Sequence, residues 1–325
     1  MRLLPEDERA ERRRRLVATL GPDSHRLARD LARSGATDFR LNASHLSPVE
    51  LANVLAGLRG ACDSVPIVVD LQGAKIRLGR FEPRTVAAGE PLRFALDGRD
   101  GIPVPHPELF HQARPGDVLS VDDGRLRLDV SQVDARSLTA VAAGPGTLRP
   151  RKGVNVEPHP VALTGLTAAD REACRMAASF GVRTFAFSFM SSAAEAAWLR
   201  EAVPGCRVVG KIERAEAVER LDEIAAVVDG LWICRGDLGA QLGAAGLARF
   251  VARLEPSQLP CPVLMAGQVL EHLTRHAEPT RSEVCHLHDL LARGYAGIVL
   301  SDETAIGRDP VRAVETAAAL LAALG

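Results

Sequence analysis

The 325-residue sequence has few aromatic residues, almost no net charge and no long apolar run. Aromatic residues make up 4% of the chain and the formal net charge is −1, so the composition does not favour nucleic acid or an anionic membrane surface as a partner. No apolar run approaches the ~18 residues that indicate a membrane span. These absences exclude a function that depends on overall charge, and they point to a localised site.

Several sequence signatures are also missing. The six cysteines include no C-x-x-C pair, and the amino terminus lacks the apolar region of a secretory signal. We therefore expect a reduced, cytoplasmic protein. No G-x-G-x-x-G or P-loop motif opens a helix, which argues against a dinucleotide site or a Walker site. The basic run at residues 12–15 follows several acidic residues, so we interpret it as a solvated helix end.

Short apolar runs alternate with amphipathic segments along most of the chain. Eight such runs lie near residues 16, 38, 66, 184, 207, 230, 262 and 297. Unbroken apolar strands joined by helices indicate strands that are buried on both faces, hence a parallel sheet. Eight strand–helix units predict an α/β fold, a closed (β/α)8 TIM barrel, rather than an open doubly wound sheet.

Helical periodicity disappears between residues 75 and 151. This stretch is rich in Gly, Pro and Asp, and it contains short segments in which apolar and polar residues alternate. The pattern predicts a small all-β domain inserted after the third strand. The expected division is therefore residues 1–74 for the first part of the barrel, 75–151 for the inserted domain and 152–325 for the second part of the barrel.

Charged residues follow two consecutive strands of the predicted barrel. K-I-E (211–213) ends the strand near residue 207, and R-G-D-L-G (235–239) follows the strand near residue 230. Because the carboxyl ends of parallel strands converge on one rim, we expect Lys211, Glu213 and Asp237 to lie close together. Two carboxylates are suitable ligands for Mg²⁺, and an ammonium balances the charge of a phosphorylated or enolate-forming substrate.

Two further patterns leave alternatives open. The segment 235–239 is predicted to be a loop whose glycines expose backbone amides to an anion, and a plain tight turn is the alternative. His272 and His276, and the run Cys285-His286-Leu287-His288, have partial zinc spacing without a third ligand, so we interpret them as helix-surface histidines. The other polar candidates at strand ends are Thr19, Arg40, Asn42, Ser44, Asp70, Ser188, Arg235, Gln268, Ser301 and Glu303.

These residues resemble the pyruvate kinase family. The resemblance runs in order through LVATLGPDS (16–24), FRLNASH (39–45), VVDLQGAKIRLG (68–79), VDDG (121–124), KGVN (152–155), FSF (187–189), KIE (211–213), ICRGDLG (233–239), EPTRSEV (278–284) and LSDETAIG (300–307). It covers nearly the whole chain. It implies a catalytic barrel, a mobile lid at residues 75–151, and Mg²⁺-dependent transfer of phosphate from phosphoenolpyruvate to ADP, which gives pyruvate and ATP in glycolysis.

The resemblance also implies roles for individual residues. Glu213 and Asp237 would bind Mg²⁺ or Mn²⁺, Lys211 would neutralise the transferring phosphoryl group, and Arg40 would hold the phosphate. The residues near the substrate would be Ser188, Arg235, Gly236 and Asp237, and the residues near the nucleotide would be Asn42, His45, Arg77 and Lys152. The expected partners are therefore small molecules, with no nucleic acid and no membrane.

Departures from the family pattern modify these expectations. Asn42, Ser44 and Asp70 match positions that hold K⁺ in many members, but Lys75 replaces a glutamate and Leu71 replaces a threonine. We expect the ammonium of Lys75 to substitute for the monovalent cation, so that K⁺ is not required. The chain ends after the eighth helix, so we also expect no regulatory domain, and a monomer or homodimer.

Two other departures keep a second activity open. Gly267 replaces a threonine linked to enolate protonation, and Ile306 replaces a lysine near the nucleotide phosphates. The alternative is a Mg²⁺-dependent lyase or aldolase that acts on pyruvate or a related 2-oxo acid through an enolate. A third, non-catalytic interpretation is a degenerate paralogue that binds metabolites or partners, and the intact Lys211, Glu213, Arg235 and Asp237 argue against it.

Overall fold

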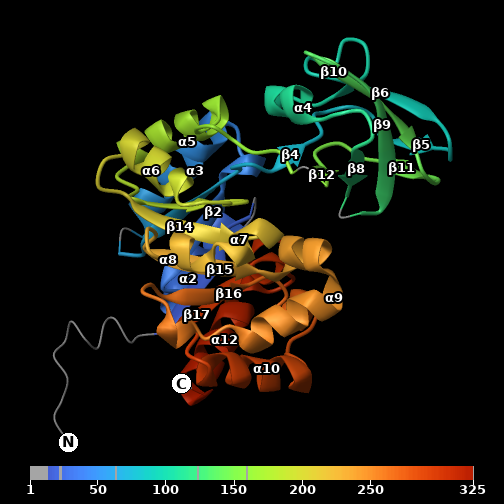
Figure 1. Ribbon diagram of the computed structural model, residues 1–325. Coiled ribbons are helices and arrows are strands. Elements are labelled where there is room, and N and C mark those ends of the chain that lie inside the picture. The colour runs from blue at the N-terminus through green and yellow to red at the C-terminus, as the bar shows by residue number, and fades with distance from the viewer. Residues whose placement is uncertain (1–13, 22–23, 63, 123, 159, 325) are drawn as a thin grey trace, which may run out of the picture. The chain divides into compact units, whose positions relative to one another are not determined.

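The computed structural model describes residues 14–21, 24–62, 64–122, 124–158 and 160–324, so Arg12 and Arg13 of the basic run lie outside the described residues. The chain forms two compact units. One runs to Gly73 and resumes at Gly165, and the other is Ala74–Thr164. In Figure 1 the first unit contains the blue and the yellow-to-red parts of the chain, and the second contains the cyan-to-green part.

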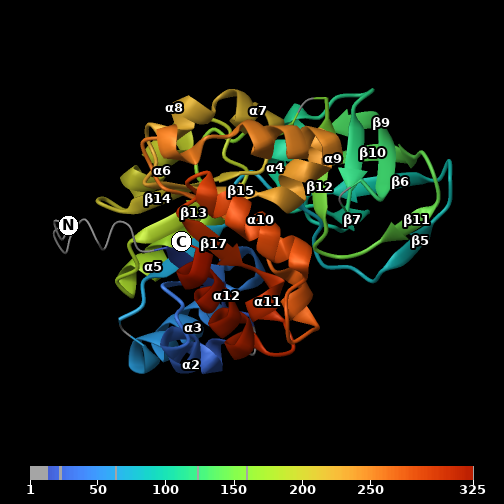
Figure 2. The ribbon, with the colours of Figure 1, turned by 90° about the horizontal axis from the view of Figure 1, so that it is seen from below.

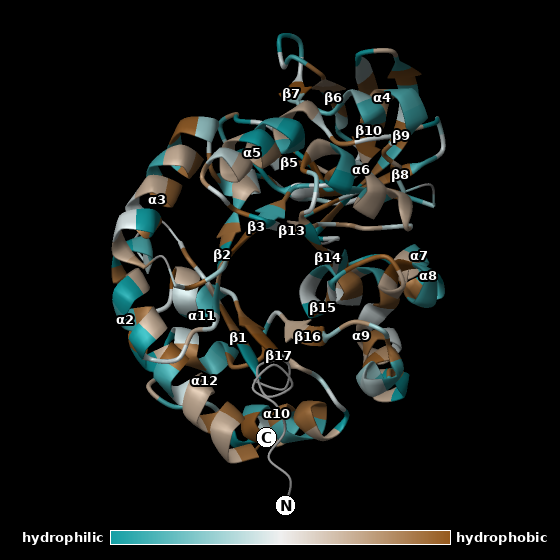
Figure 3. Ribbon diagram, turned by 90° about the vertical axis from the view of Figure 1, so that its left-hand side faces the viewer, coloured by the Kyte–Doolittle hydropathy of each residue, from teal (hydrophilic) through white to brown (hydrophobic). Residues whose placement is uncertain are grey.

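Eight parallel strands close the first unit into a barrel, in the order β1-β17-β16-β15-β14-β13-β3-β2. They are β1 (Arg15–Thr19), β2 (Asp38–Asn42), β3 (Ile67–Leu71), β13 (Thr184–Phe187), β14 (Arg207–Ile212), β15 (Gly230–Cys234), β16 (Val263–Ala266) and β17 (Gly297–Leu300). Figure 3 shows these strands as a ring with helices outside it. The predicted (β/α)8 barrel is confirmed, because β17 pairs with β1 and closes the sheet.

Helices follow the barrel strands and cover their outer faces (Figures 2 and 3). The α-helices are α2 (Ala28–Arg33), α3 (Pro48–Ala61), α5 (Ala168–Ser179), α6 (Ala194–Ala202), α7 (Ala215–Glu219), α8 (Leu221–Ala225), α9 (Arg235–Arg253), α10 (Arg281–Ala292), α11 (Asp302–Ala305) and α12 (Pro310–Leu324). The short 3-10 helices are η1 (Ser24–Leu27), η2 (Ala43–His45), η3 (Pro256–Gln258) and η4 (Glu271–Thr274). No helix in the described ranges is both long enough and apolar enough to cross a membrane.

Helix α3 shows how local sequence sets these boundaries. Pro48 is its first residue, and Ser47 forms a capping box with Glu50, in which each side chain accepts a hydrogen bond from the other residue's backbone amide. Such a box satisfies two amides that have no acceptor within the helix.

The barrel interior is packed mainly with small and branched side chains, with Trp232 as its one large member: Val17, Val68, Ala186, Val209, Trp232, Cys234, Leu264, Ala266 and Val299.

The second unit is a β domain with its own hydrophobic core. Its seven-stranded sheet has the order β4-β12-β8-β9-β10-β6-β7, and β11 pairs with β5. The strands are β4 (Ile76–Arg77), β5 (Arg84–Val86), β6 (Pro91–Ala95), β7 (Ile102–Pro103), β8 (Val118–Val121), β9 (Leu126–Asp134), β10 (Ser137–Ala142), β11 (Gly146–Leu148) and β12 (Gly153–Glu157). A short helix, α4 (Pro107–Gln112), interrupts the strands and was not expected from the sequence.

The turn after β3 requires glycine at position 73. Gly73 has a φ of +58°, and a Cβ there would lie 2.0 Å from the carbonyl oxygen of Ser188. We expect Gly73→Ala to lower the free energy of unfolding of the barrel by more than about 2 kcal/mol, because the left-handed conformation alone costs an L-residue roughly 1–2 kcal/mol. Denaturant unfolding can be followed by tryptophan fluorescence, since Trp198 and Trp232 both lie in this unit.

Gly205→Ala is the matched control for this substitution. Gly205 also has a left-handed φ, +74°, but no described atom lies within 4 Å of the Cβ that alanine would add. It should therefore show the conformational cost without the clash, a loss of roughly 1–2 kcal/mol. Equal losses in the two variants would contradict the role assigned to the contact with Ser188.

Candidate active site

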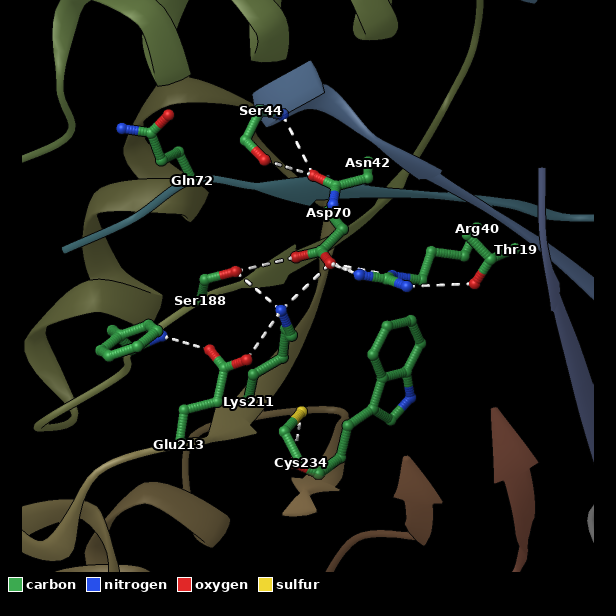
Figure 4. A network of polar contacts seen from close by, with 12 residues as sticks. Thr19, Arg40, Asn42, Ser44, Asp70, Gln72, Ser188, Lys211, Glu213 and Cys234 are labelled. Atoms are coloured by element: carbon green, nitrogen blue, oxygen red, sulfur yellow. Dashed lines mark hydrogen bonds and ion pairs between the residues drawn. The ribbon is translucent and has the colours of Figure 1, made fainter. Parts of the chain in front are cut away.

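Four charged side chains converge at the carboxyl ends of β2, β3 and β14 (Figure 4). Asp70 Oδ2 accepts hydrogen bonds from Arg40 Nε at 2.8 Å and from Arg40 Nη2 at 2.6 Å. Lys211 Nζ lies 3.1 Å from the same oxygen and 3.1 Å from Glu213 Oε1. The exposed fractions of Asp70, Lys211 and Glu213 are 1%, 6% and 3%. These charges are therefore compensated by one another rather than by water.

Neutral groups on the segment after β13 complete the hydrogen bonding of this cluster. Ser188 Oγ accepts from Lys211 Nζ at 2.8 Å and donates to Asp70 Oδ1 at 3.1 Å. The backbone amide of Phe189 donates to Glu213 Oε2 at 2.8 Å. Phe189 has a φ of +58°, an unusual conformation for a residue other than glycine. This backbone conformation accompanies an amide that is directed at the carboxylate of Glu213.

Arg40 is held from a second side. Its Nη1 donates to Thr19 Oγ1 at 3.0 Å, and the Thr19 hydroxyl donates in turn to the carbonyl oxygen of Leu300 at 2.7 Å. Asn42, at the end of β2, accepts hydrogen bonds through Oδ1 from the amide and the hydroxyl of Ser44, at 3.1 and 2.6 Å. Thus Arg40 belongs to the charged cluster, while Asn42 and Ser44 form a local turn at the start of η2.

Electrostatics keep the buried lysine and the central aspartate ionised. Burial raises the pKa of Asp70, but the neighbouring Lys211 and Arg40 outweigh it, and the pKa is lowered overall. Burial lowers the pKa of Lys211, but the carboxylates of Asp70 and Glu213 outweigh it, and the pKa is raised overall. The cluster therefore presents an ammonium and a guanidinium that are fixed in place before any ligand binds.

A cavity of about 160 Å³ opens beside the cluster. Its lining includes Arg40, Lys211 and Glu213 from the strand ends, and Gly236 and Asp237 from the start of α9. This volume is below the ~300–1,000 Å³ of sites that hold drug-sized ligands. The cavity therefore suits a small organic acid and a metal ion, and a nucleotide would have to extend beyond it. The two carboxylates in the lining, Glu213 and Asp237, are a suitable donor set for a divalent cation.

The segment 235–239 is helical, so the loop prediction was wrong. Helix α9 begins at Arg235, directly after β15, and within the described residues no side chain caps its first turn. The two glycines do not stop the helix, which continues to a kink at Gly243, where φ is +68° and a second helical segment follows. The first amides of a helix have no acceptor within it, and here Gly236 lines the cavity, so this helix start can receive an anion.

Some predicted residues lie away from the cavity wall. Arg235 Nε donates to the carbonyl oxygen of Gly267 at 2.9 Å, and its Nη2 donates to that of Gln268, so Arg235 holds the turn after β16. Glu303 is 1% exposed and accepts from the amides of Ser301 at 2.7 Å and Leu270 at 3.4 Å. These two side chains support the rim rather than line the cavity.

The positions that depart from the family pattern differ in exposure. Gly267 lines the cavity with a φ of +79°, and a Cβ there would lie 3.7 Å from the amide nitrogen of Gly236. The missing side chain therefore leaves this part of the wall as bare backbone. Ile306 follows α11 and is 69% exposed. Its side chain is apolar, so this position on the rim carries no charge.

The remaining nucleotide and cation candidates are divided between the units. His45 lies in η2 of the barrel unit. Lys75, Arg77 and Lys152 lie in the second unit, where Lys152 Nζ is 2.9 Å from the carboxylate of Asp122. These three residues therefore belong to a different unit from the barrel cavity.

The histidine interpretation needs correction. His272 lies in the 3-10 helix η4 and His276 lies beyond it, so they do not share an α-helix. Their rings stack with centroids 3.8 Å apart, and His272 Nδ1 is 2.7 Å from the carbonyl oxygen of Glu278. Across the described ranges, no three His, Cys, Asp or Glu side chains form a group that could hold a metal. His272 and His276 therefore belong to η4 and the residues after it, whereas His286 and His288 lie in α10, as expected.

Sequence reasoning missed several cavity residues and one backbone donor. Trp232 and Cys234 line the cavity, and burial strongly raises the pKa of the Cys234 thiol. Period-two alternation along β15, which ends just before R-G-D, would have placed both on one face. The Phe189 amide has no comparable sequence signal, because its direction depends on an unusual backbone conformation.

The fold and the site define a (β/α)8 enzyme with two carboxylates, a buried lysine and a helix start around a small polar cavity. The family model for the pyruvate kinase barrel domain matches residues 11–314. Pyruvate kinases from Methylorubrum extorquens and Agrobacterium vitis are each 34% identical, over 94% of this chain and 67% of their own length. Pyruvate kinase from Corynebacterium efficiens is 32% identical, over 94% and 68%. The chain belongs to the pyruvate kinase family, a family of phosphotransferases.

Removal of the central carboxylate tests the cluster. Asp70→Asn leaves Arg40 and Lys211 buried without their shared partner, so we expect the free energy of unfolding at neutral pH to fall by about 3–5 kcal/mol. The folded-state pKa of Asp70 is lowered, so its stabilisation is present above the unfolded pKa of about 3.9 and is lost as pH falls through the lower folded value. The difference between the two proteins in urea unfolding should therefore shrink below about pH 4.

Glu172→Gln is the control, a carboxylate in α5 of the same unit whose ion pair lies at the surface. Glu172 pairs with Arg175, and the two side chains are 36% and 72% exposed, so water can replace the lost contact. We expect a smaller loss, about 1 kcal/mol. A loss as large as that of Asp70→Asn would contradict the special cost assigned to the buried cluster.

Proposed function

We propose that this protein transfers phosphate between phosphoenolpyruvate and ADP in a Mg²⁺-dependent reaction, which gives pyruvate and ATP. The observation that carries the proposal is the cavity around which Lys211, Glu213, Asp237 and the start of α9 converge. Phosphoryl transfer depends on positioning and charge stabilisation more than on covalent chemistry. A site with fixed cations, two metal-binding carboxylates and an anion-binding helix start meets those requirements.

Glu213 and Asp237 would hold the divalent cation, Mg²⁺ or Mn²⁺. Both carboxylates line the cavity, and the Phe189 amide fixes the orientation of Glu213. When bound, the cation would supply positive charge to the oxygen of an enolate or of pyruvate. Two protein ligands leave positions for water and substrate oxygens, which is usual for Mg²⁺.

The two buried cations would bind the phosphate. Lys211 is held by Asp70, Glu213 and Ser188, so its ammonium does not have to reorganise when charge develops on the transferring group. Arg40 is held by Asp70 and Thr19, and it also lines the cavity. The amides of Gly236 and Asp237 would receive the substrate carboxylate, because the first turn of a helix attracts anions.

The nucleotide would bind outside the cavity. Asn42 and His45 are candidates from the barrel, and Arg77 and Lys152 are candidates from the inserted unit. The presence of Arg77 and Lys152 favours the kinase over an activity without nucleotide. All six cysteines are free thiols, which favours a reducing, cytoplasmic location. The proposed partners are small molecules only, and we propose a monomer or homodimer.

The alternative is a Mg²⁺-dependent lyase or aldolase that acts through an enolate of pyruvate or a related 2-oxo acid. Gly267 favours it, because the cavity wall there carries no hydroxyl that can protonate an enolate. The exposed Ile306 also favours it, because an apolar side chain there cannot hold nucleotide phosphates. Both activities use Glu213 and Asp237, so nucleotide binding distinguishes them.

Calorimetry with ADP and Mg²⁺, followed by a coupled assay with phosphoenolpyruvate, tests the choice between the two activities. We expect ADP to bind and Lys211→Met to lower turnover by about a hundredfold to a thousandfold or more, the cost of losing a group that stabilises charge in the transition state. Binding of oxalate, an enolate mimic, should show that the variant keeps its folded cavity. Oxalate binding without ADP binding would favour the lyase, and unchanged turnover in Lys211→Met would refute the kinase.

A second test concerns the monovalent cation. With the ammonium of Lys75 as its substitute, replacement of Na⁺ by K⁺ should leave the rate of phosphoryl transfer nearly unchanged. Lys75→Glu should make the rate depend on added K⁺, whereas Lys75→Gln should lower the rate without rescue by K⁺, since it supplies no carboxylate. A large rate increase with K⁺ in the unmodified protein would contradict this role.

A further inference from the structure

The buried carboxylate of Asp170 contacts barrel residues next to both ends of the inserted unit. Asp170 lies in the first turn of α5 and is 2% exposed. Its Oδ1 accepts from the backbone amide of Gln72 at 3.0 Å, the carboxylate also accepts from the backbone of Gly73, and its Oδ2 accepts from the Thr167 hydroxyl at 2.8 Å. Gln72 and Gly73 precede the first residue of the second unit, and Thr167 follows the point where the chain returns at Gly165.

A helix cap alone does not explain this arrangement. In α3 and α10, the acid three residues after the N-cap, Glu50 or Glu283, accepts from the amide of its own N-cap residue, and Glu283 also accepts from the amide of His272. Thr167 is the N-cap of α5 and accepts from the amide of Asp170 at 3.0 Å, but Asp170 directs Oδ1 to an amide 98 residues away in the sequence. Asp170 therefore joins α5 to the end of β3 in addition to capping the helix.

The buried position of this carboxylate is costly. Burial raises the pKa of Asp170 to about 6, although the hydroxyl of Thr167 and the amides of Gln72 and Gly73 act in the opposite direction. An exposed acid such as Glu50 would cap a helix without that cost. The cost is consistent with a second role for the Asp170 carboxylate at the connections.

The turn after β3 is held on two sides. Asp170 binds its amides, and Gly73 packs so closely on Ser188 that a Cβ would lie 2.0 Å from the Ser188 carbonyl oxygen. Asp70, at the end of β3, keeps its own bonds to Arg40, Lys211 and Ser188. Loss of Asp170 would therefore release the connection to the inserted unit more than it would disturb the charged cluster.

We propose that Asp170 is a positioning residue for phosphoryl transfer, which ties the outgoing and returning connections of the inserted unit to the start of α5. This inference rests on the proposed function, in which Arg77 and Lys152 of the inserted unit bind the nucleotide while Lys211, Glu213 and Asp237 of the barrel bind the small substrate. Release of the connections should weaken the contribution of the inserted unit and leave the barrel cavity intact. The effect should therefore fall on the nucleotide.

Steady-state kinetics of Asp170→Ala test this inference. We expect the KM for ADP to rise by roughly tenfold, the size expected for the loss of one or two buried hydrogen bonds. The KM for phosphoenolpyruvate and the affinity for oxalate with Mg²⁺ should change much less. Glu50→Ala, which removes the exposed capping acid of α3, should leave both KM values unchanged. An equal rise in the two KM values, or no rise for ADP, would overturn the proposal.

Amide hydrogen exchange provides a readout that needs no turnover. Exchange at Gln72 and Gly73 should accelerate in Asp170→Ala and not in Glu50→Ala. Asp170→Asn keeps one acceptor oxygen, so it should accelerate exchange less and restore most of the affinity for ADP. It also provides the test if the alanine variant does not fold. Unchanged exchange in both Asp170 variants would overturn the proposed role of Asp170 at these two residues. If exchange is faster in the variants but the wild-type protein does not transfer phosphate, only the proposed function is refuted.

Discussion

The mutual dependence of buried charges at one end of the barrel sets the structure of the site. Asp70 is nearly inaccessible to water and lies between the guanidinium of Arg40 and the ammonium of Lys211, which also contacts Glu213. An isolated charge in such a position would be strongly unfavourable, but paired and hydrogen-bonded charges are tolerated. Each member therefore fixes the others, and the cations are held in position before a ligand binds.

This arrangement places the small cavity in the barrel unit. The barrel cavity of about 160 Å³ is suited to a small acid with its metal ion, while a nucleotide needs groups outside it. The candidates for that role, Arg77 and Lys152, belong to the unit whose connections meet at the carboxylate of Asp170. In the proposed function, the contacts of Asp170 would therefore affect nucleotide binding more than binding of the small acid.

Periodic features of the fold were predictable, and features set by long-range contacts were not. The eight barrel strands follow from apolar runs alternating with helices, and the meeting of Lys211 with Glu213 follows from their i, i+2 spacing at the end of one strand. By contrast, Gly236 and Gly239 led to the prediction of a loop where α9 begins. The Phe189 amide and the contact of Asp170 with Gln72 depend on backbone conformation and on pairing across 98 residues, which no local pattern records.

The central claim is that this charge cluster supports transfer of a phosphoryl group between two substrates. Phosphorus NMR of the purified protein with phosphoenolpyruvate, ADP and Mg²⁺ in one sample measures the fate of that group directly. The account predicts that the phosphoenolpyruvate signal falls as the signals of ATP rise in equal amount, with pyruvate formed alongside. Loss of phosphoenolpyruvate to inorganic phosphate, or no change in the phosphorus signals while oxalate still binds, would contradict it.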